Sequence, residues 1–485
     1  MKRTAVVLLV LSFISNQTIG QTPGHEVKFK KYHLWDEFYS EGATVADVNK
    51  DGKMDILAGA RWFEAPTWKA HDIWKHKKFD YTKGYSDSFL NYAMDVNEDG
   101  WQDLIYFDFP GKEVYWLENP QGQEVLWKRY LIDSIASNES PMHVDINGDG
   151  KKDLVFGNEK LKQMAWFSAS VKNKKVTWMR SAISEKNSTG IGLFSHGLGW
   201  GDINGDGIND VMIIGGWWEA PKDMKSSPWV FHEATLGKPC SQMLTYDFDH
   251  DGDNDVVSGS AHDFGLWWHE QEVDKNGSRT FKPHNIDTTF SELHSVVLED
   301  INQDGLPDLV TGKRFFSHQG RGPGGMGPAV LYWFELLTNG KQKPVWIRHE
   351  IDNTSGVGIQ FVTHDMNQDG KPDIVISNKN GVFYFEQIKF ITMDKLEKKH
   401  LMEKMMRELD DILNSQTSLL KKISQLEAEN INLGNSVLEK RLPDIHVKVD
   451  DGIGEIALVI EEFAVAKNKF VTDNKLDEGL AEQGT

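Results

Sequence analysis

The sequence predicts an all-β fold, a seven-bladed β-propeller with calcium loops, followed by a C-terminal α-helical coiled coil. Three observations lead to this prediction. A nine-residue segment rich in aspartate occurs seven times, a four-strand pattern surrounds each copy, and apolar residues follow a heptad pattern after Ile391. The copies begin 45–65 residues apart. Four strands repeated at this period are typical of propeller blades.

The first residues have the pattern of an export signal. Lys2 and Arg3 precede an apolar run from Ala5 to Ile14, which is too short to cross a bilayer, and small residues follow up to Gly20. We therefore expect residues 1–20 to be a signal peptide, no transmembrane segment, and a mature protein that is periplasmic or secreted. A buried N-terminal strand is the alternative.

Composition argues against nucleic-acid binding and excludes an intramolecular disulfide. The formal net charge of -20 argues against nucleic acid, because no basic stripe is present to neutralise phosphates. Cys240 is the single cysteine, so an intramolecular disulfide is impossible. We expect this thiol to be a small buried apolar group rather than a nucleophile.

The repeated segments have fixed positions and one free position. They read DVNKDGKMD (47–55), DVNEDGWQD (95–103), DINGDGKKD (145–153), DINGDGIND (202–210), DFDHDGDND (247–255), DINQDGLPD (300–308) and DMNQDGKPD (365–373). Position 7 varies freely, as expected where a backbone carbonyl is the ligand. The expected calcium ligands are the side chains at positions 1, 3, 5 and 9: Asp47, Asn49, Asp51, Asp55, Asp95, Asn97, Asp99, Asp103, Asp145, Asn147, Asp149, Asp153, Asp202, Asn204, Asp206, Asp210, Asp247, Asp249, Asp251, Asp255, Asp300, Asn302, Asp304, Asp308, Asp365, Asn367, Asp369 and Asp373.

These segments are not EF-hands. An EF-hand closes with a bidentate Glu at position 12, whereas position 12 here is Ala, Tyr, Phe, Ile, Ser or Thr. Asp at position 9 closes the loop, and a strand follows at once. Simple acidic turns are the alternative, but three carboxylates about 5 Å apart repel by roughly 3 kcal/mol per pair. A bound divalent cation removes this repulsion.

Each repeat has the same expected strands. A first strand enters the loop and a second leaves it, a third carries an aromatic pair such as YWFE (332–335), and a fourth alternates as in VWIRHEID (345–352). The seventh repeat lacks a fourth strand, but a strand of that type, VKFKKYHLW (27–35), precedes the first repeat. We expect it to complete the ring, which gives a propeller over residues 25–388 with no exposed sheet edge.

These loops and strands resemble the FG-GAP/VCBS repeat family, whose propellers include the integrin α head and many exported bacterial proteins. The segment GKRFFSHQGRGPGG (312–325), followed by YWFE, resembles the propeller part of aldos-2-ulose dehydratases. The first resemblance implies a calcium-binding propeller. The second implies dehydration of a keto sugar, although no cupin domain of the fungal enzymes is present.

The residues at the other end of the strands are the candidate catalytic groups. His196 and His294 each stand six residues before their loop, and His262, Lys313 and Arg314 follow second strands. Histidine exchanges protons near neutral pH, and Lys or Arg stabilises a carboxylate or enolate. We expect His196 and His294 to be the acid/base pair, His262 to assist, and Lys313 and Arg314 to hold an anion.

Five further residues are candidate substrate contacts around the same funnel. They are Arg61 and Asp263 after second strands, His143 two residues before its loop, and His318 and Arg321 in the Gly- and Pro-rich insertion 317–330. Any one of the histidines is equally explained as a surface or core residue. The interpretation depends on their convergence at one end of the strands.

The function expected from this set is carbohydrate β-elimination. An exported lyase or dehydratase would act on a uronic acid or keto sugar, for example an acidic algal oligosaccharide such as an ulvan fragment. The alternative is a non-catalytic, calcium-dependent propeller that binds glycans or mediates adhesion. A glycoside hydrolase is a third option, but no clear carboxylate pair stands outside the loops.

The C-terminal region has apolar residues on a heptad. Met402, Leu409, Ile423 and Val437 take a positions, and the d positions are Met405, Ile412, Leu419, Leu426 and Leu433. This pattern predicts a coiled coil over residues 392–441, most simply a parallel dimer that ends at Pro443, and so a homo-oligomer. A helix folded back on the propeller is the alternative. Residues 442–485 form a tail of unassigned structure.

Overall fold

The computed structural model describes residues 27–388 and 395–476, except 76, 339–342 and 475, and the chain divides into two compact units between residues 389 and 390. The expected signal peptide, residues 1–20, lies outside the described residues. Neither helix in the described part of the chain is apolar enough over a sufficient length to cross a membrane.

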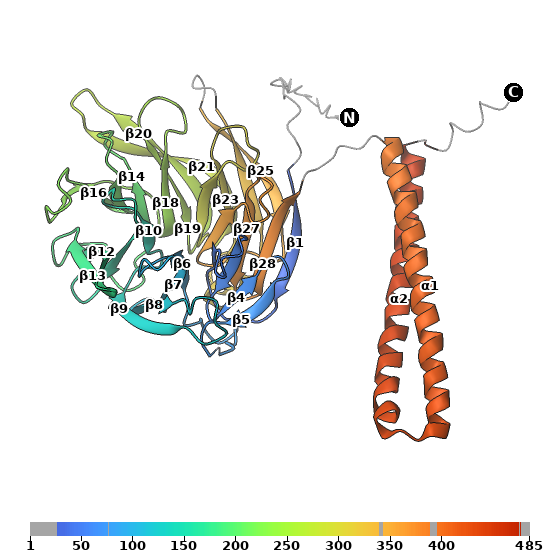
Figure 1. Cartoon of the computed structure of the whole chain (residues 1–485). Helices are drawn as coiled ribbons and strands as arrows, with labels where there is room; N and C mark the ends of the chain where they lie inside the picture. Colours follow the sequence, from blue (N-terminus) through green and yellow to red (C-terminus); the bar gives the residue numbers. More distant parts are fainter. Residues whose placement is uncertain (1–26, 76, 339–342, 389–394, 475, 477–485) are drawn as a thin grey trace, which may run out of the picture. The chain divides into compact units, whose positions relative to one another are not determined.

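The first unit consists of many small sheets, arranged around a centre in Figure 1. Five sheets have four strands, and one has eight because β14 pairs in parallel with β18. The four-stranded sheets contain β2 (Thr44–Ala46), β3 (Asp55–Ala58), β4 (Arg61–Glu64) and β5 (Lys69–Asp72); β6 (Leu90–Met94), β7 (Asp103–Phe107), β8 (Lys112–Glu118) and β9 (Lys128–Ala136); β10 (Met142–Val144), β11 (Asp153–Asn158), β12 (Gln163–Lys172) and β13 (Lys175–Ala182); β22 (Val296–Glu299), β23 (Asp308–Gly312), β24 (Leu331–Leu337) and β25 (Val345–Asp352); and β26 (Phe361–His364), β27 (Asp373–Asn378), β28 (Gly381–Ile388) and β1 (Lys28–Trp35).

The eight-stranded sheet joins two sets of four strands. The first set is β14 (Leu198–Gly201), β15 (Asp210–Ile213), β16 (Gly216–Glu219) and β17 (Val230–Glu233), and the second is β18 (Cys240–Tyr246), β19 (Asp255–Ser260), β20 (Phe264–Val273) and β21 (Arg279–Ser291). Within each set, neighbouring strands run antiparallel. Each set therefore has the same meander as the other sheets.

The first strand of the chain completes the last sheet. β1 pairs antiparallel with β28, from Lys28 opposite Ile388 to Trp35 opposite Val382. The strand expected at residues 27–35 is therefore present, and it supplies the outer strand that the seventh repeat lacks.

The aspartate loops set the start of the second strand in every repeat. The ninth loop residue is the first residue of β3, β7, β11, β15, β19, β23 and β27. The side chains of these strands are almost entirely buried, as in β3 and β23, because a neighbouring sheet covers each face. Apolar runs such as DLVTG and DIVIS satisfy this requirement.

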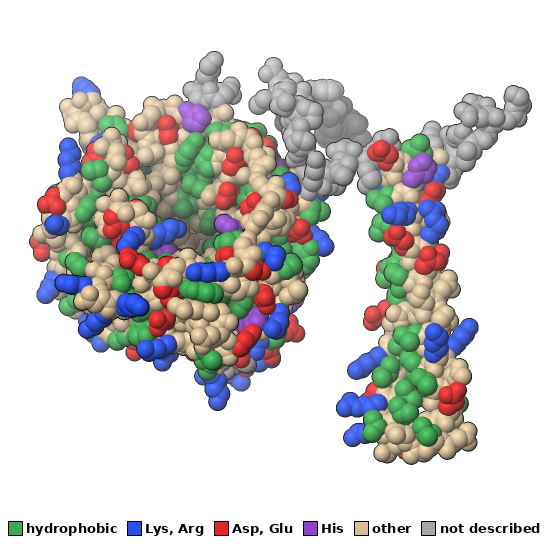
Figure 2. Space-filling view, viewed as in Figure 1, with side chains coloured by type: hydrophobic (Ala, Val, Ile, Leu, Met, Phe, Trp, Pro, Cys, Tyr) green, Lys and Arg blue, Asp and Glu red, His purple; other side chains and the backbone are tan. Residues whose placement is uncertain are grey.

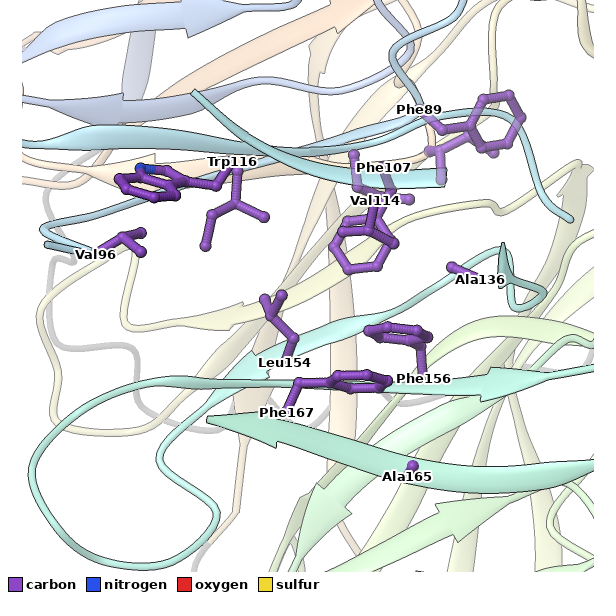
Figure 3. Packing of buried hydrophobic residues seen from close by; sticks show 13 residues of the cluster. Phe89, Val96, Phe107, Val114, Trp116, Ala136, Leu154, Phe156, Ala165 and Phe167 are labelled. Atoms are coloured by element: carbon purple, nitrogen blue, oxygen red, sulfur yellow. The ribbon is translucent and has the colours of Figure 1, made fainter. Parts of the chain in front are cut away.

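The hydrophobic core lies between neighbouring sheets rather than at one centre. In Figure 3, Phe107 of β7 meets Phe156 of β11 edge to face, with ring centroids 5.4 Å apart. Phe156 in turn stacks on Phe167 of β12 at 4.3 Å. Val114 and Leu154, also fully buried, belong to the same cluster. Repeated packing of this kind gives a β-propeller-like fold.

The second unit is a helical hairpin. α1 (Lys395–Leu433) and α2 (Ser436–Asp473) run antiparallel, since His446 of α2 contacts Glu427 of α1 at 2.7 Å while Lys398 lies over the ring of Phe470. The two helices pack against each other along their length.

The expected continuous helix over 392–441 is wrong, and so is its end at Pro443. α1 ends at Leu433, where Gly434 takes the left-handed conformation with φ 66°, and the Asn435 side chain caps α2 by accepting from Val437 N and Leu438 N. The heptad pattern continues in phase through this turn, so periodicity alone did not predict that the helix ends there. Pro443 lies inside α2, which covers most of the expected tail 442–485.

Candidate functional site

Four of the predicted histidines converge and form what we call the histidine cluster: His196, His262, His294 and His318. His196 and His294 stand just before the first strands β14 and β22, and His262 follows the second strand β19. His318 lies in a short 3-10 helix, η1 (Ser317–Gly320). The aspartate loops lie at the opposite ends of the same strands. Figure 2 shows a hollow among the sheets, with histidine and charged side chains along it.

The ring nitrogens of the cluster face one another. His196 Nε2 and His262 Nε2 are 2.9 Å apart. One ligand atom from each of His196, His262 and His294 lies within 4.8 Å of the other two, and Glu292, His294 and His318 form a second such group. Two triads that share His294 are therefore built from loops of three different sets of four strands.

A buried glutamate lies beside His196. Glu139 Oε2 lies 3.4 Å from His196 Nε2, and both side chains are about nine-tenths buried. Burial opposes a charge on His196, but the adjacent carboxylate outweighs burial and raises the pKa of His196 above its ordinary value. This imidazole is therefore suited to hold and release a proton near neutral pH.

His294 has the opposite environment. Its side chain is 1% exposed, and burial, followed by the charge of Arg314, lowers its pKa well below the ordinary value. Its Nδ1 is 3.2 Å from the Glu292 carbonyl oxygen, so Nδ1–H donates there and leaves a lone pair on Nε2. That Nε2 is buried and has no hydrogen-bond partner among the described residues. Neutral His294 is therefore a ligand or a base, not an acid.

Glu292 holds the fourth histidine. Its Oε2 lies 2.9 Å from His318 Nδ1, while its buried Oε1 has no partner among the described atoms. The backbone of Glu292 takes a left-handed φ of 62°, which is a costly conformation for this residue type. His262 is exposed at the surface of the cluster, and burial, then the charges of His196 and His318, lower its pKa.

These donors fit a divalent transition metal. Imidazole nitrogens with one or two carboxylates are ligands that zinc and similar ions prefer, and such ligation needs neutral imidazole. His294 offers the buried unpartnered nitrogen, and Glu292 offers the buried unpartnered oxygen. The lowered pKa values of His262 and His294 keep both neutral.

A buried basic group lies beside the cluster. Arg314 is 1% exposed, donates to Glu41 Oε2 at 2.8 Å, and lies over the ring of Tyr85. Lys379 lies over the same ring at 4.1 Å, and burial lowers its pKa to about 8. Lys313 is also buried, and its Nζ donates to the Gly325 carbonyl at 2.8 Å.

The structure places the other predicted residues apart from the cluster or at its edge. Arg61 pairs with Asp72 and lies over the Trp35 ring. The His143 ring packs against Tyr92, and burial lowers its pKa to about 3. The remaining two are exposed: Asp263 pairs with Lys238 at 3.2 Å, and Arg321 lies in the insertion.

The sequence contained a signal for carboxylates that the prediction missed. Glu41 and Glu139 stand six residues before Asp47 and Asp145, which is the position of His196 and His294 in their repeats. Reading all seven repeats at this position would have found them. Glu292, two residues before His294, depends on the turn after β21 and has no such signal.

The aspartate loops share one pattern of hydrogen bonds. In all seven, the first Asp accepts from the backbone N–H groups of positions 5 and 6, as Asp47 does from Asp51 N and Gly52 N. The ninth Asp is buried in each. Burial is the largest cause that raises the pKa of these carboxyls, for example to about 6 in Asp55 and about 7 in Asp308.

A family model supports the repeat. The FG-GAP-like repeat matches at residues 95–156 and 247–311. The chain contains FG-GAP-like repeats. Both matched segments include an aspartate loop with the strands on either side, so the resemblance inferred from these loops is confirmed at two places.

Other similarities are distant. A T-cell immunomodulatory protein homolog of Plasmodium falciparum (isolate 3D7) is 26% identical, over 39% of this chain and 32% of the relative, so the match spans about a third of that protein. A rhamnogalacturonan lyase structure aligns with 74% of this chain and 72% of its own at 11% identity and a TM-score of 0.37. A Photorhabdus luminescens Tc holotoxin pore aligns with 74% of this chain and 15% of its own at 15% identity and a TM-score of 0.31. The two structures say nothing about the histidine cluster.

Proposed function

We propose that this protein is an exported carbon–oxygen lyase that performs β-elimination on a uronic acid or keto sugar at the histidine cluster. The observation that carries the proposal is the convergence of four histidines with Glu139 and Glu292. Such a set serves proton transfer next to a carbonyl better than it serves simple sugar binding, which needs neither buried carboxylates nor unpartnered ring nitrogens.

The residues divide into two roles. Glu292, His294 and His318, whose ligand atoms lie within 4.8 Å of one another, would hold a divalent transition metal, which when bound would supply a Lewis acid for the substrate carbonyl or carboxylate. His196 exchanges protons. In the elimination, His196 removes the proton next to the carbonyl and becomes an imidazolium, and the carbon–carbon double bond forms as the bond to the β-hydroxyl breaks. The hydroxyl takes the proton back from His196 and leaves as water. We therefore assign the proton exchange to His196 rather than to the expected pair of His196 and His294, because burial and the charge of Arg314 lower the pKa of His294.

The basic residues supply charge rather than direct contacts. Arg314 is buried and bonded to Glu41, so it acts on the hollow through its field. Arg314, Lys313 and Lys379 carry three positive charges. They balance the three negative charges of Glu41, Glu139 and Glu292. A bound divalent ion would leave the hollow positive, and that balance favours an acidic substrate over a neutral one.

The architecture carries two further proposals. The seven sets of four strands are the blades of a propeller, and the aspartate loops bind calcium through positions 1, 3, 5 and 9. The buried ninth aspartates support the second proposal, because seven carboxylates with raised pKa values need a neighbouring cation to stay charged. The helical hairpin would mediate self-association.

The test is an elimination assay with matched variants. The full chain is incubated with a panel of uronate oligosaccharides and keto sugars, and the conjugated product is followed by its ultraviolet absorbance. We expect activity that His196→Ala and His294→Ala abolish and that His232→Ala, which changes an outer histidine paired with Glu219, leaves intact. Metal analysis should show a transition metal in the wild type that His294→Ala loses. Binding without turnover would overturn the lyase in favour of a glycan-binding propeller.

A further inference from the structure

The helical hairpin leaves an apolar face uncovered. The d positions of α1, Met405, Ile412, Leu419, Leu426 and Leu433, are between 44% and 70% exposed. The a and e positions, among them Ile423 and Asn430, point at α2 and are more buried. These d residues form a stripe of about 40 Å, given a rise of 1.5 Å per residue.

α2 extends the same face. Its buried positions, which include Leu442 and Val471, place Ile445 and Val459 on the corresponding stripe, and both are nearly half exposed. The register of the hairpin lies between those given by the His446–Glu427 contact and the Lys398–Phe470 contact, which places Ile445 about level with Leu426 and Val459 about level with Ile412. In antiparallel helices, equal flanking positions lie on the same side. Both stripes therefore form one flat apolar face, which Figure 2 shows in part near the α1–α2 turn.

The opposite face of α1 is largely polar. It carries Glu403, Asp410, Thr417 and Ser424, with Ile431 as the exception. Two amphipathic helices with one shared apolar face are half of a four-helix bundle. The sequence thus specifies a partner for one side of α1 only.

Charges beside the apolar face match a second copy of the same hairpin. Glu408 and Lys422 stand seven residues on either side of Ser415, and all are exposed. A two-fold axis at Ser415, perpendicular to the helices, places each Glu408 opposite the other copy's Lys422. The self-complementary pattern is the one that an isologous interface requires.

The same two-fold axis also places opposite charges of α2 across from each other. Lys448 and Glu462 stand seven residues on either side of Glu455, and the register between the His446–Glu427 and Lys398–Phe470 contacts places Glu455 about level with Ser415. One axis therefore pairs Glu408 with Lys422 on α1 and Lys448 with Glu462 on α2. Glu455 meets its own copy at the exposed edge, where solvent screens the repulsion.

We propose that two copies of this chain associate through the apolar faces of their hairpins, to form an antiparallel four-helix bundle with α1 against α1 and α2 against α2. Every neighbouring pair of helices in this bundle is antiparallel. Ile412, Leu419 and Leu426 become its central layers, and Gly452, level with Leu419, leaves room for the partner's Val459. The interface joins two β units through one compact element.

The first test measures mass. The full chain should have twice the chain mass in light scattering. Leu419→Asp, which puts a charge on the apolar face, should reduce this to one chain mass, and Ser424→Asp, which puts the same charge on the opposite face, should not. Far-ultraviolet circular dichroism confirms that both variants keep their helices. A monomeric wild type, or a Leu419→Asp dimer, would overturn the proposal, since the face would then be covered by the rest of this chain or by another protein.

The second test fixes the orientation. Glu408→Lys or Lys422→Glu alone turns two attractive contacts into two repulsive ones and should weaken the dimer about tenfold. The double variant restores opposite charges and should return the dissociation constant to near the wild-type value. If the double variant binds as weakly as the sum of the single changes, the α1–α1 pairing is wrong.

Discussion

Replacement of Asp308 by Asn should stabilise the protein without calcium and destabilise it with calcium. Asp308 is the ninth residue of the sixth aspartate loop and has no exposed surface. Its Oδ2 accepts from Ile301 N and its Oδ1 from Leu336 N, each at 3.0 Å. Burial is the largest influence on this carboxyl and raises its pKa from 3.8 to about 7.

The magnitude follows from that shift. Three pKa units correspond to roughly 4 kcal/mol, which is the cost of keeping this carboxylate charged at pH 8 without a cation. Asparagine removes the charge but places an NH₂ group against one of the two backbone donors, which costs roughly 1–3 kcal/mol. In a chelator, Asp308→Asn should therefore be about 1–3 kcal/mol more stable than the wild type. In calcium the wild type should be the more stable, because the variant has lost a ligand.

The pH dependence has a definite sign. The folded-state pKa of Asp308 lies above the unfolded value, so the folded state binds more protons, and stability is lost as pH rises from about 4 to 7. In a chelator, the wild type should melt at a lower temperature at pH 8 than at pH 5, and calcium should remove most of that difference.

The assay is thermal unfolding at pH 5 and pH 8, each in calcium and in chelator. Asp263→Asn is the control, since Asp263 is an exposed carboxylate that lies outside the loops and pairs with Lys238. It should change little in any buffer. A loss of stability in Asp308→Asn that is equal with calcium and with chelator would show that the carboxylate only accepts backbone hydrogen bonds, and the calcium proposal would fail for this loop.

Three other predictions follow from buried groups of the β unit. Lys379→Met should raise the melting temperature at pH 7; because the folded pKa of Lys379 is about 8, below the unfolded value, wild-type stability rises from pH 8 to about 10 and the advantage of the variant disappears there. An advantage that persists at pH 10 would contradict this. Glu41→Ala should cost about 3–5 kcal/mol in denaturant unfolding, because it leaves Arg314 buried and unpaired, and a cost below 1 kcal/mol would refute that reading. Cys240, fully buried with its pKa raised to about 12, should react with a thiol reagent only on unfolding; reaction in the native state would show an unexpected opening.

The sequence predicted the strands and loops well, because both depend on local chemistry. Asp and Gly at fixed loop positions specify a turn wherever they occur, and the apolar runs after them can only be buried strands. The strand at 27–35 was found by counting, since the last repeat lacked an outer strand. The pairing of β1 with β28 agrees with that count.

The site was predicted less completely, because side-chain burial depends on neighbouring repeats. His196, His262, His294 and His318 converge as expected, but which of them carries a proton depends on Glu139 and Glu292. Arg314 was expected to contact an anion, yet Glu41, far away in sequence, neutralises it. The turn at Gly434 was missed because the heptads continue through it in phase.

The pairing of β1 with β28 joins a strand that is synthesised early to one that is synthesised more than 300 residues later. During synthesis β1 has no partner until almost 390 residues have been made. The sheets at both ends of the growing array therefore keep unpaired edge strands in every earlier intermediate. A second chain at the same stage offers an identical β1, and exchange of that strand would link two molecules with only native hydrogen bonds. Slow release of the C-terminal part of the β unit should therefore favour strand-swapped assemblies over single closed molecules.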